Sequence, residues 1–77
     1  MYDAQTCLKR ISIMQKKKGF RYVSAMLRDA GIPVSTIDNI KQGKRPSIDR
    51  LMELADYFNC SIDYLVGRTD NPEMNRK

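Results

Sequence analysis

Apolar residues recur at three- and four-residue spacing along most of this chain, the period of an α-helix that buries one face. The pattern predicts four helices, over residues 3–18, 21–30, 34–42 and 48–58, and a short fifth helix that begins after Ser61 and ends at Gly67. The sequence therefore predicts an all-α domain of five helices.

One face of each predicted helix is expected to form the core. The residues on these faces are, in chain order, Cys7, Leu8, Ile11, Met14, Val23, Met26, Leu27, Ala30, Ile37, Ile40, Ile48, Leu51, Leu54, Ala55, Phe58, Ile62, Leu65 and Val66. Ser47 and Ser61 are predicted to cap the last two helices, because a serine hydroxyl can accept a free backbone N–H of the first turn. A chain of 77 residues buries only about 60% of its unfolded surface, which predicts one small domain, residues 1–67, and a polar tail, residues 68–77.

A glycine turn separates the second and third helices. Gly31 stands between two helical patterns, where a left-handed residue is usually needed. Pro33 suits the first position of the next helix, since its missing N–H would have no partner there, and Gly43 is expected to end that helix. With Ile37 and Ile40 facing inward, the residues expected to point outward are Ser35, Thr36, Asp38, Asn39 and Gln42.

This segment resembles the helix-turn-helix of the Cro and phage-repressor (Xre-type) family. The residues in register with the family pattern are Gly31, Ile32, Ile37, Ile40 and Gly43, and the likeness continues through GKRPS at 43–47, the helix at 48–58 and SIDYLVG at 61–67. The resemblance covers residues 5–67. It implies a five-helix lambda-repressor-like fold in which the second and third helices form the helix-turn-helix.

The sequence departs from the family pattern at two positions. Leu27 stands where the family prefers alanine, and Pro33 stands where it prefers a serine or threonine cap. The larger Leu27 side chain is expected to push the two helices slightly apart or to turn their crossing.

The resemblance also implies which residues contact DNA. It places Val34, Ser35 and Asn39 at base-facing positions of the third helix, inserted in the major groove. Of these, only Asn39 can make a bidentate base contact, to adenine N6 and N7, which adds about 1–3 kcal/mol of discrimination. Val34 can instead pack against Tyr22, and the sequence leaves both roles open.

The positions that the resemblance assigns to phosphate contacts flank this helix. They are Arg21, Tyr22, Gln42, Lys44, Arg45 and Ser47. Asp38 would repel phosphate, so it is expected to point away from DNA or to pair with Lys41 or Gln42.

The charge distribution favours a polyanionic partner. Residues 1–50 carry eleven Lys and Arg against four Asp and Glu, whereas residues 51–77 carry three against five. This asymmetry indicates contact with a phosphate backbone. An alternative to phosphate contact, a purely structural role, is open to Lys16, Lys17 and Lys18, because cations in the last turn of a helix interact favourably with the helix dipole.

The sequence offers few residues that could support catalysis or bind a metal ion. The chain has no histidine, and its two cysteines, Cys7 and Cys60, are far apart and lie on apolar faces. They are expected to be reduced core residues, with no metal, no cofactor and no enzymatic activity. No apolar run is long enough to cross a bilayer and the first ten residues do not resemble a signal peptide, which predicts a cytoplasmic protein.

The function that these features predict is sequence-specific binding of double-stranded DNA by a transcriptional regulator. We expect a repressor that covers promoter elements as a homodimer on a pseudo-palindromic operator, without a small-molecule ligand. An alternative is a protein-interaction module, such as an antitoxin or adaptor, that uses Tyr57, Tyr64 and Met74. RNA binding is disfavoured because the basic half shows no evident aromatic stacking platform.

Overall fold

The computed structural model describes residues 2–72. Its helices are α1 (Ala4–Lys18), α2 (Val23–Ala30), α3 (Ser35–Lys41), α4 (Ile48–Phe58) and α5 (Ile62–Val66). All regular structure in this part of the chain is helical, so the all-α, five-helix prediction is confirmed.

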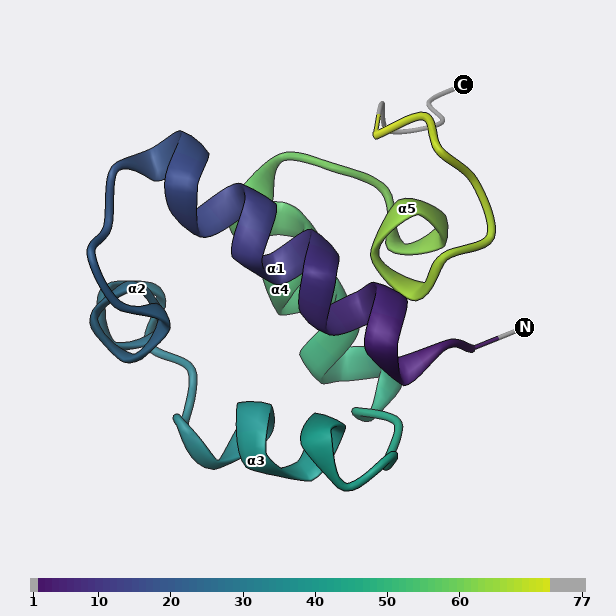
Figure 1. The fold of residues 1–77 in the computed structure, drawn as a ribbon, viewed down its shortest axis with the longest axis horizontal. Coiled ribbons are helices and arrows are strands. Elements are labelled where there is room, and N and C mark those ends of the chain that lie inside the picture. Colours follow the sequence, from purple (N-terminus) through teal and green to yellow (C-terminus); the bar gives the residue numbers. More distant parts are fainter. Residues whose placement is uncertain (1, 73–77) are drawn as a thin grey trace.

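The helix α1 holds the fold together. It crosses in front of α4 in Figure 1, and it contacts α2, α3 and α5. The helix α3 runs along the lower edge of this view, with α2 at its left and the loop to α4 at its right. One side of α3 therefore packs on the domain and the other is left on the surface.

The first helix begins at a side-chain cap. Asp3 Oδ1 accepts the backbone N–H groups of Gln5 and Thr6 at 3.1 and 3.3 Å, and the Thr6 hydroxyl donates to Asp3 Oδ2 at 2.8 Å. These hydrogen bonds, led by that from the Thr6 side chain, hold the pKa of Asp3 below its ordinary value. Asp3 therefore accepts backbone N–H groups of the first turn that have no partner within the helix, and its negative charge interacts favourably with the positive end of the helix dipole.

The serine caps of the last two helices are confirmed. Ser47 Oγ accepts the N–H of Arg50 at 3.2 Å, and Ser61 Oγ accepts the N–H of Tyr64 at 3.0 Å. Such a cap contributes about 1 kcal/mol to helix stability. The capped start of α4 fixes the loop that precedes it, and this loop carries several of the predicted DNA contacts.

The core contains most of the predicted apolar positions. The largest side chains with less than 2% exposure are Ile11, Met26, Leu27, Ile40, Leu54, Leu65, Cys7 and Cys60. Both cysteines are free thiols, as expected, and burial raises the pKa of each to about 11. They are therefore neutral at physiological pH and behave as small apolar residues.

One predicted core residue is on the surface. Ile48, the first residue of α4, is 62% exposed, because it precedes the turn of α4 at which Leu51 enters the core. Leu8 on α1 and Ile62 on α5 are only half-buried, at the edge of the core.

The first residues of the predicted tail are attached to the domain. The Arg10 guanidinium donates to the carbonyls of Tyr64 and Thr69 at 3.0 and 2.8 Å and to the Asp70 carboxylate at 3.0 Å. It also lies 4.1 Å from the centre of the Tyr64 ring. The Ser61 N–H donates to the Pro72 carbonyl at 2.9 Å. Residues 68–72 thus lie along α1 and α5, and residues 73–77 are outside the described part of the chain.

Replacing Leu27 tests how much the domain depends on this buried side chain. Leu27 is 0% exposed, so Leu27→Ala is expected to lower the free energy of unfolding by about 2–5 kcal/mol through lost burial and a residual cavity. Urea denaturation followed by circular dichroism measures the change. The matched control, Ile13→Ala, removes atoms from a side chain that is 37% exposed and should cost distinctly less; equal losses would contradict the packing described.

Candidate nucleic-acid interface

The second and third helices are joined by the tight turn that the sequence predicts. Gly31 has φ 74°, in the left-handed region, and ends α2. The next residue, Ile32, donates its N–H to the Leu27 carbonyl at 2.9 Å and is only 4% exposed. The chain therefore turns into the core at Ile32 before it returns to the surface at α3.

The start of α3 differs from the prediction. Pro33 was expected at the first helical position, but α3 begins at Ser35 and Val34 is its N-cap, with φ −64° and ψ −27°. The Pro33 carbonyl accepts the N–H of Thr36 at 3.1 Å, and the Val34 carbonyl accepts that of Ile37 at 3.0 Å. These are i to i+3 bonds, so a tight turn of 3₁₀ type leads from the proline into the helix.

The outer face of α3 is polar. Ser35, Asp38 and Asn39 are exposed, as expected, and so is Gln42, which caps the C-terminus of the helix. The expectation for Thr36 was wrong. It is 7% exposed, because it lies on the same side of the helix as Ile40 and turns with it toward the rest of the domain.

The two apolar or aromatic residues near the start of this face are both accessible. Val34 is 37% exposed and Tyr22 is 63% exposed. Val34 therefore keeps surface with which it can meet a thymine methyl group. Asp38 is exposed but forms no ion pair within residues 2–72, so of the alternatives expected for it, the pairing with Lys41 is absent there.

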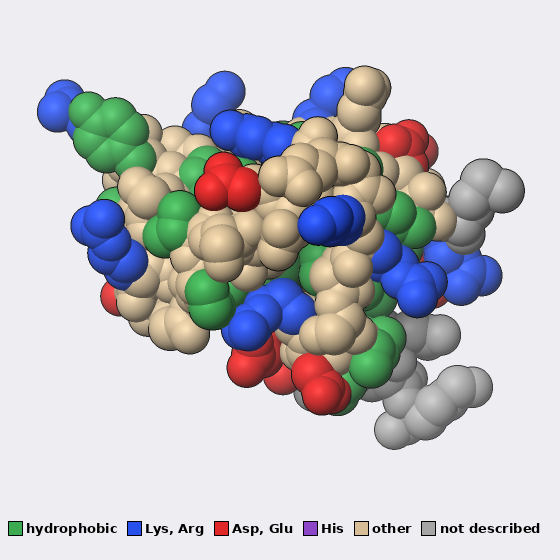
Figure 2. All heavy atoms as spheres, turned by 90° about the horizontal axis from the view of Figure 1, so that it is seen from below, with side chains coloured by type: hydrophobic (Ala, Val, Ile, Leu, Met, Phe, Trp, Pro, Cys, Tyr) green, Lys and Arg blue, Asp and Glu red, His purple; other side chains and the backbone are tan. Residues whose placement is uncertain are grey.

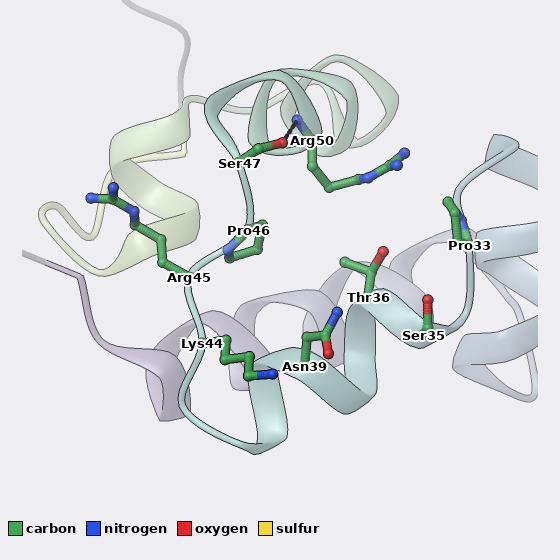
Figure 3. A pocket seen from close by; sticks show the side chains of 9 residues that line it. All are labelled: Pro33, Ser35, Thr36, Asn39, Lys44, Arg45, Pro46, Ser47 and Arg50. Carbon is green, nitrogen blue, oxygen red and sulfur yellow. Dashed lines mark hydrogen bonds between the residues drawn. The ribbon is translucent and has the colours of Figure 1, made fainter.

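A cleft of about 260 Å³ separates α3 from the start of α4 (Figure 3). The residues that line it are Pro33, Ser35, Thr36, Asn39, Lys44, Arg45, Pro46, Ser47 and Arg50. Figure 3 shows the side chains of Ser35, Thr36 and Asn39 directed from α3 toward α4, with Lys44 extending toward Asn39. The structure thus gathers two predicted base-contacting residues and three predicted phosphate-contacting residues around one opening.

The remaining predicted contacts lie outside this cleft. Arg21 and Tyr22 are exposed just before α2, Gln42 is at the end of α3, and Val34 lies beside the cleft without lining it. Arg45 lines the cleft, yet its side chain extends away from α3 on the other side of the loop (Figure 3).

Arg50 belongs to this cleft and was missed in the sequence analysis. It follows Ser47 by three residues, the spacing that places two side chains on one side of a helix, and its side chain extends from α4 into the opening (Figure 3). The guanidinium forms an ion pair with Glu53 and its side chain is 30% exposed. The signal available in the sequence was this spacing after the basic loop.

The face that carries α3 is rich in cations. Figure 2 views the molecule from this side: Lys and Arg side chains are spread over most of this face, while acidic side chains are fewer, with one near the middle and others mainly along the lower edge. Such an excess of cations attracts a polyanion.

A comparison with protein families matches residues 10–71 to the Cro/C1-type HTH DNA-binding domain. This chain belongs to that family. The resemblance inferred from residues 31–43 is therefore confirmed, as is the helix-turn-helix formed by α2 and α3. DNA is accordingly the partner that the family supports. Comparisons with curated proteins and with solved structures gave no match.

Among the described residues, no helix is both long and apolar enough to cross a membrane.

Arg50 provides a test of the cleft in this DNA-binding domain. Arg50→Gln is expected to weaken binding to a duplex of mixed sequence roughly three- to tenfold at low salt, because it removes a cation beside the proposed phosphate contacts. Fluorescence anisotropy measures the affinity. Arg28→Gln makes the same change in charge at an exposed site on α2 outside the cleft; an equal loss in both variants would show that Arg50 contributes only to the overall charge.

Proposed function

We propose that this chain is a sequence-specific, double-stranded-DNA-binding transcriptional regulator that inserts α3 into the major groove. The observation that carries the proposal is the exposed polar face of α3 beside a cleft with Lys44, Ser47 and Arg50. A helix enters the major groove with side chains that meet base edges while flanking donors hold phosphates. The site offers both kinds of group within one opening.

In this proposal the bases are contacted by Val34, Ser35 and Asn39. The Asn39 amide is exposed and can donate to and accept from adenine in a bidentate contact. Ser35 can exchange a hydrogen bond with several bases, and Val34 can contact a thymine methyl. Direct readout by one protomer is modest, since Asn39 alone can form a bidentate pair.

Phosphates are held on both sides of α3. Arg21 and Tyr22 contact the backbone at the start of α2, and Gln42, Lys44, Arg45 and Ser47 contact it from the loop. The exposure of the loop side chains and the capped start of α4 support this arrangement. Backbone N–H groups in the first turn of α4 can also donate to a phosphate, with the helix dipole favouring the anion.

The proposed mode of action is repression. A small protein bound across promoter elements blocks polymerase without a catalytic or ligand-sensing function. No enzymatic activity is therefore part of this function, and the protein would act in the cytoplasm, where the DNA lies. Two copies on a pseudo-palindromic operator would place two α3 helices in successive major grooves, about 34 Å apart. The second copy supplies the discrimination that one protomer lacks.

The side chains that motivated a protein-interaction module are engaged within the domain. The Tyr57 hydroxyl donates to the Asp29 carboxylate at 2.7 Å, and Lys18 Nζ lies 4.3 Å from the centre of its ring. Burial and this hydrogen bond raise the pKa of Tyr57 to about 12. Tyr64 is 9% exposed, and Met74 lies outside the described residues. Tyr57 and Tyr64 thus complete the domain, which favours the DNA-binding function.

Selection from a random duplex library, followed by anisotropy across a salt series, tests the proposal. We expect one enriched sequence with two symmetric half-sites, and strong binding with an affinity that falls steeply with salt. A library without enrichment, or equally weak binding to selected and scrambled duplexes, would refute sequence-specific regulation.

Asn39→Ala tests base readout. It is expected to lower the affinity for the selected duplex by about 1–3 kcal/mol per half-site while leaving the affinity for a scrambled duplex and the salt slope nearly unchanged. Anisotropy with both duplexes measures the two effects. A loss of the same size on the two duplexes would contradict the base-contacting role.

Lys44→Ala tests phosphate contact. It is expected to weaken binding to all duplexes and to reduce the slope of log affinity against log salt by about one per site. The Lys44 backbone carbonyl accepts a hydrogen bond from Tyr2 at 3.0 Å, and the substitution leaves this bond in place. Lys17→Ala, in the last turn of α1, is the control with the same change in charge. An unchanged slope for Lys44→Ala would argue against phosphate contact.

A further inference from the structure

A hydrogen bond joins the N-terminal segment to the loop between α3 and α4. The Tyr2 hydroxyl donates to the backbone carbonyl of Lys44 at 3.0 Å, although the two residues are 42 positions apart in the sequence. In Figure 1 the first turn of α1 lies beside this loop, at the right of the view. The bond therefore ties the position of the loop to that of the N-terminal segment.

The donor of this bond is itself held in place. The Tyr2 ring is partly buried against the core. The next residue, Asp3, donates its backbone N–H to the Val66 carbonyl at 3.2 Å, and its carboxylate caps α1. Burial raises the pKa of Tyr2 above its ordinary value, so the hydroxyl keeps its proton and can donate at neutral pH. Tyr2 is thus anchored to α1 and α5 before it reaches the loop.

The acceptor residue is held through both of its peptide groups. The Lys44 N–H donates to the Asn39 carbonyl at 3.0 Å, and the Lys44 carbonyl accepts the bond from Tyr2. The two rigid peptide planes that flank an α-carbon set its φ and ψ angles, and with them the direction of the Cα–Cβ bond. A lysine side chain is flexible, so its backbone decides the region that the ammonium group can reach. Here that direction carries Lys44 toward Asn39 (Figure 3).

The loop has few other attachments. Its start is tied to α3 by the N–H of Lys44, and its end is fixed by the Ser47 cap of α4. Between these points, the backbone of Arg45 and Pro46 forms no hydrogen bond within residues 2–72. The bond from Tyr2 is therefore the constraint that acts on the middle of the loop.

We propose that Tyr2 is a positioning residue for DNA binding, whose hydroxyl holds the Lys44 backbone so that the Lys44 side chain meets a phosphate. The inference rests on the proposed function in one respect, the phosphate contact of Lys44. Tyr2 itself does not touch DNA. Because the bond orients a contact that carries no sequence information, its loss lowers the affinity for every duplex and leaves base preference unchanged.

Tyr2→Phe tests the hydroxyl, since it keeps the ring and removes the donor. Anisotropy with the selected and the scrambled duplex across a salt series is expected to show binding weakened about two- to tenfold on both, with a slope of log affinity against log salt reduced by up to about one per site. The matched control is Tyr57→Phe, which removes a hydroxyl that donates to Asp29 at 2.7 Å, away from the loop. It should bind DNA like the wild type.

A double-mutant cycle tests whether Tyr2 acts through Lys44. In a Lys44→Ala background, Tyr2→Phe is expected to change the affinity and the salt slope very little, because the side chain that the hydroxyl positions is already absent. A purely structural role of Tyr2 would give the same loss in both backgrounds. Circular dichroism under the assay conditions checks that the single and double variants remain helical.

The outcomes separate this inference from the proposed function. A Tyr2→Phe protein that binds like the wild type, while Lys44→Ala lowers the salt slope, would overturn the positioning role and leave the phosphate contact intact. An equal loss from Tyr2→Phe in the Lys44→Ala background would also overturn it, since the hydroxyl would then act by another route. An unchanged slope for Lys44→Ala would refute the phosphate contact, and the positioning role with it.

Discussion

The packing of α1 against three other helices is the constraint on which the rest of the structure depends. Cys7, Ile11 and Met14 are buried on one side of α1, and α2, α3 and α5 all contact this helix. A chain of 77 residues has little apolar surface to bury, so a single central helix must serve several partners. Because α3 contacts α1 and buries Ile37 and Ile40 in the core, its opposite side is the one that faces outward.

The nucleic-acid interface follows from this arrangement and from the end of α3. The turn at Gly31 and Ile32 anchors the start of α3 in the core, and the chain beyond Gly43 returns to α4 through an exposed basic loop. The capped start of α4 then places Arg50 on the α4 side of the cleft that Asn39 lines from α3. The groups proposed to read bases and those proposed to hold phosphates thus come from different elements, and their relative position depends on core packing rather than on contacts between them.

Polar interactions at the periphery hold segments that the core does not reach. Arg10 binds two carbonyls and a carboxylate of residues beyond α4, and it stacks on Tyr64. The ion pair to Asp70 is exposed and adds little by itself, whereas the two carbonyl contacts come from a side chain that is largely buried. Tyr2 has the same role at the other end, where it connects the N-terminal segment to the loop at Lys44.

The sequence by itself determined the five helices, the serine caps of the last two and the likeness to the family. Helical periodicity identifies the residues that form the apolar face of each helix. A turn and two helix starts are marked by Gly31, Ser47 and Ser61, because their backbone and hydrogen-bonding preferences are local and need no tertiary contact. Those features predicted an all-α fold, the resemblance to the Cro and phage-repressor family implied the helix-turn-helix, and the family comparison confirms both.

Only the tertiary structure decided which side chains at the edges of the apolar helix faces are exposed to solvent. Thr36 is buried because it lies on the side of α3 that faces α4, and Ile48 stays on the surface because α4 enters the core a turn later. Arg50 joins the site because the loop from α3 brings α4 alongside it. Periodicity cannot resolve these positions, since a helical face has broad edges and its rotation is set by neighbouring helices that are distant in the sequence.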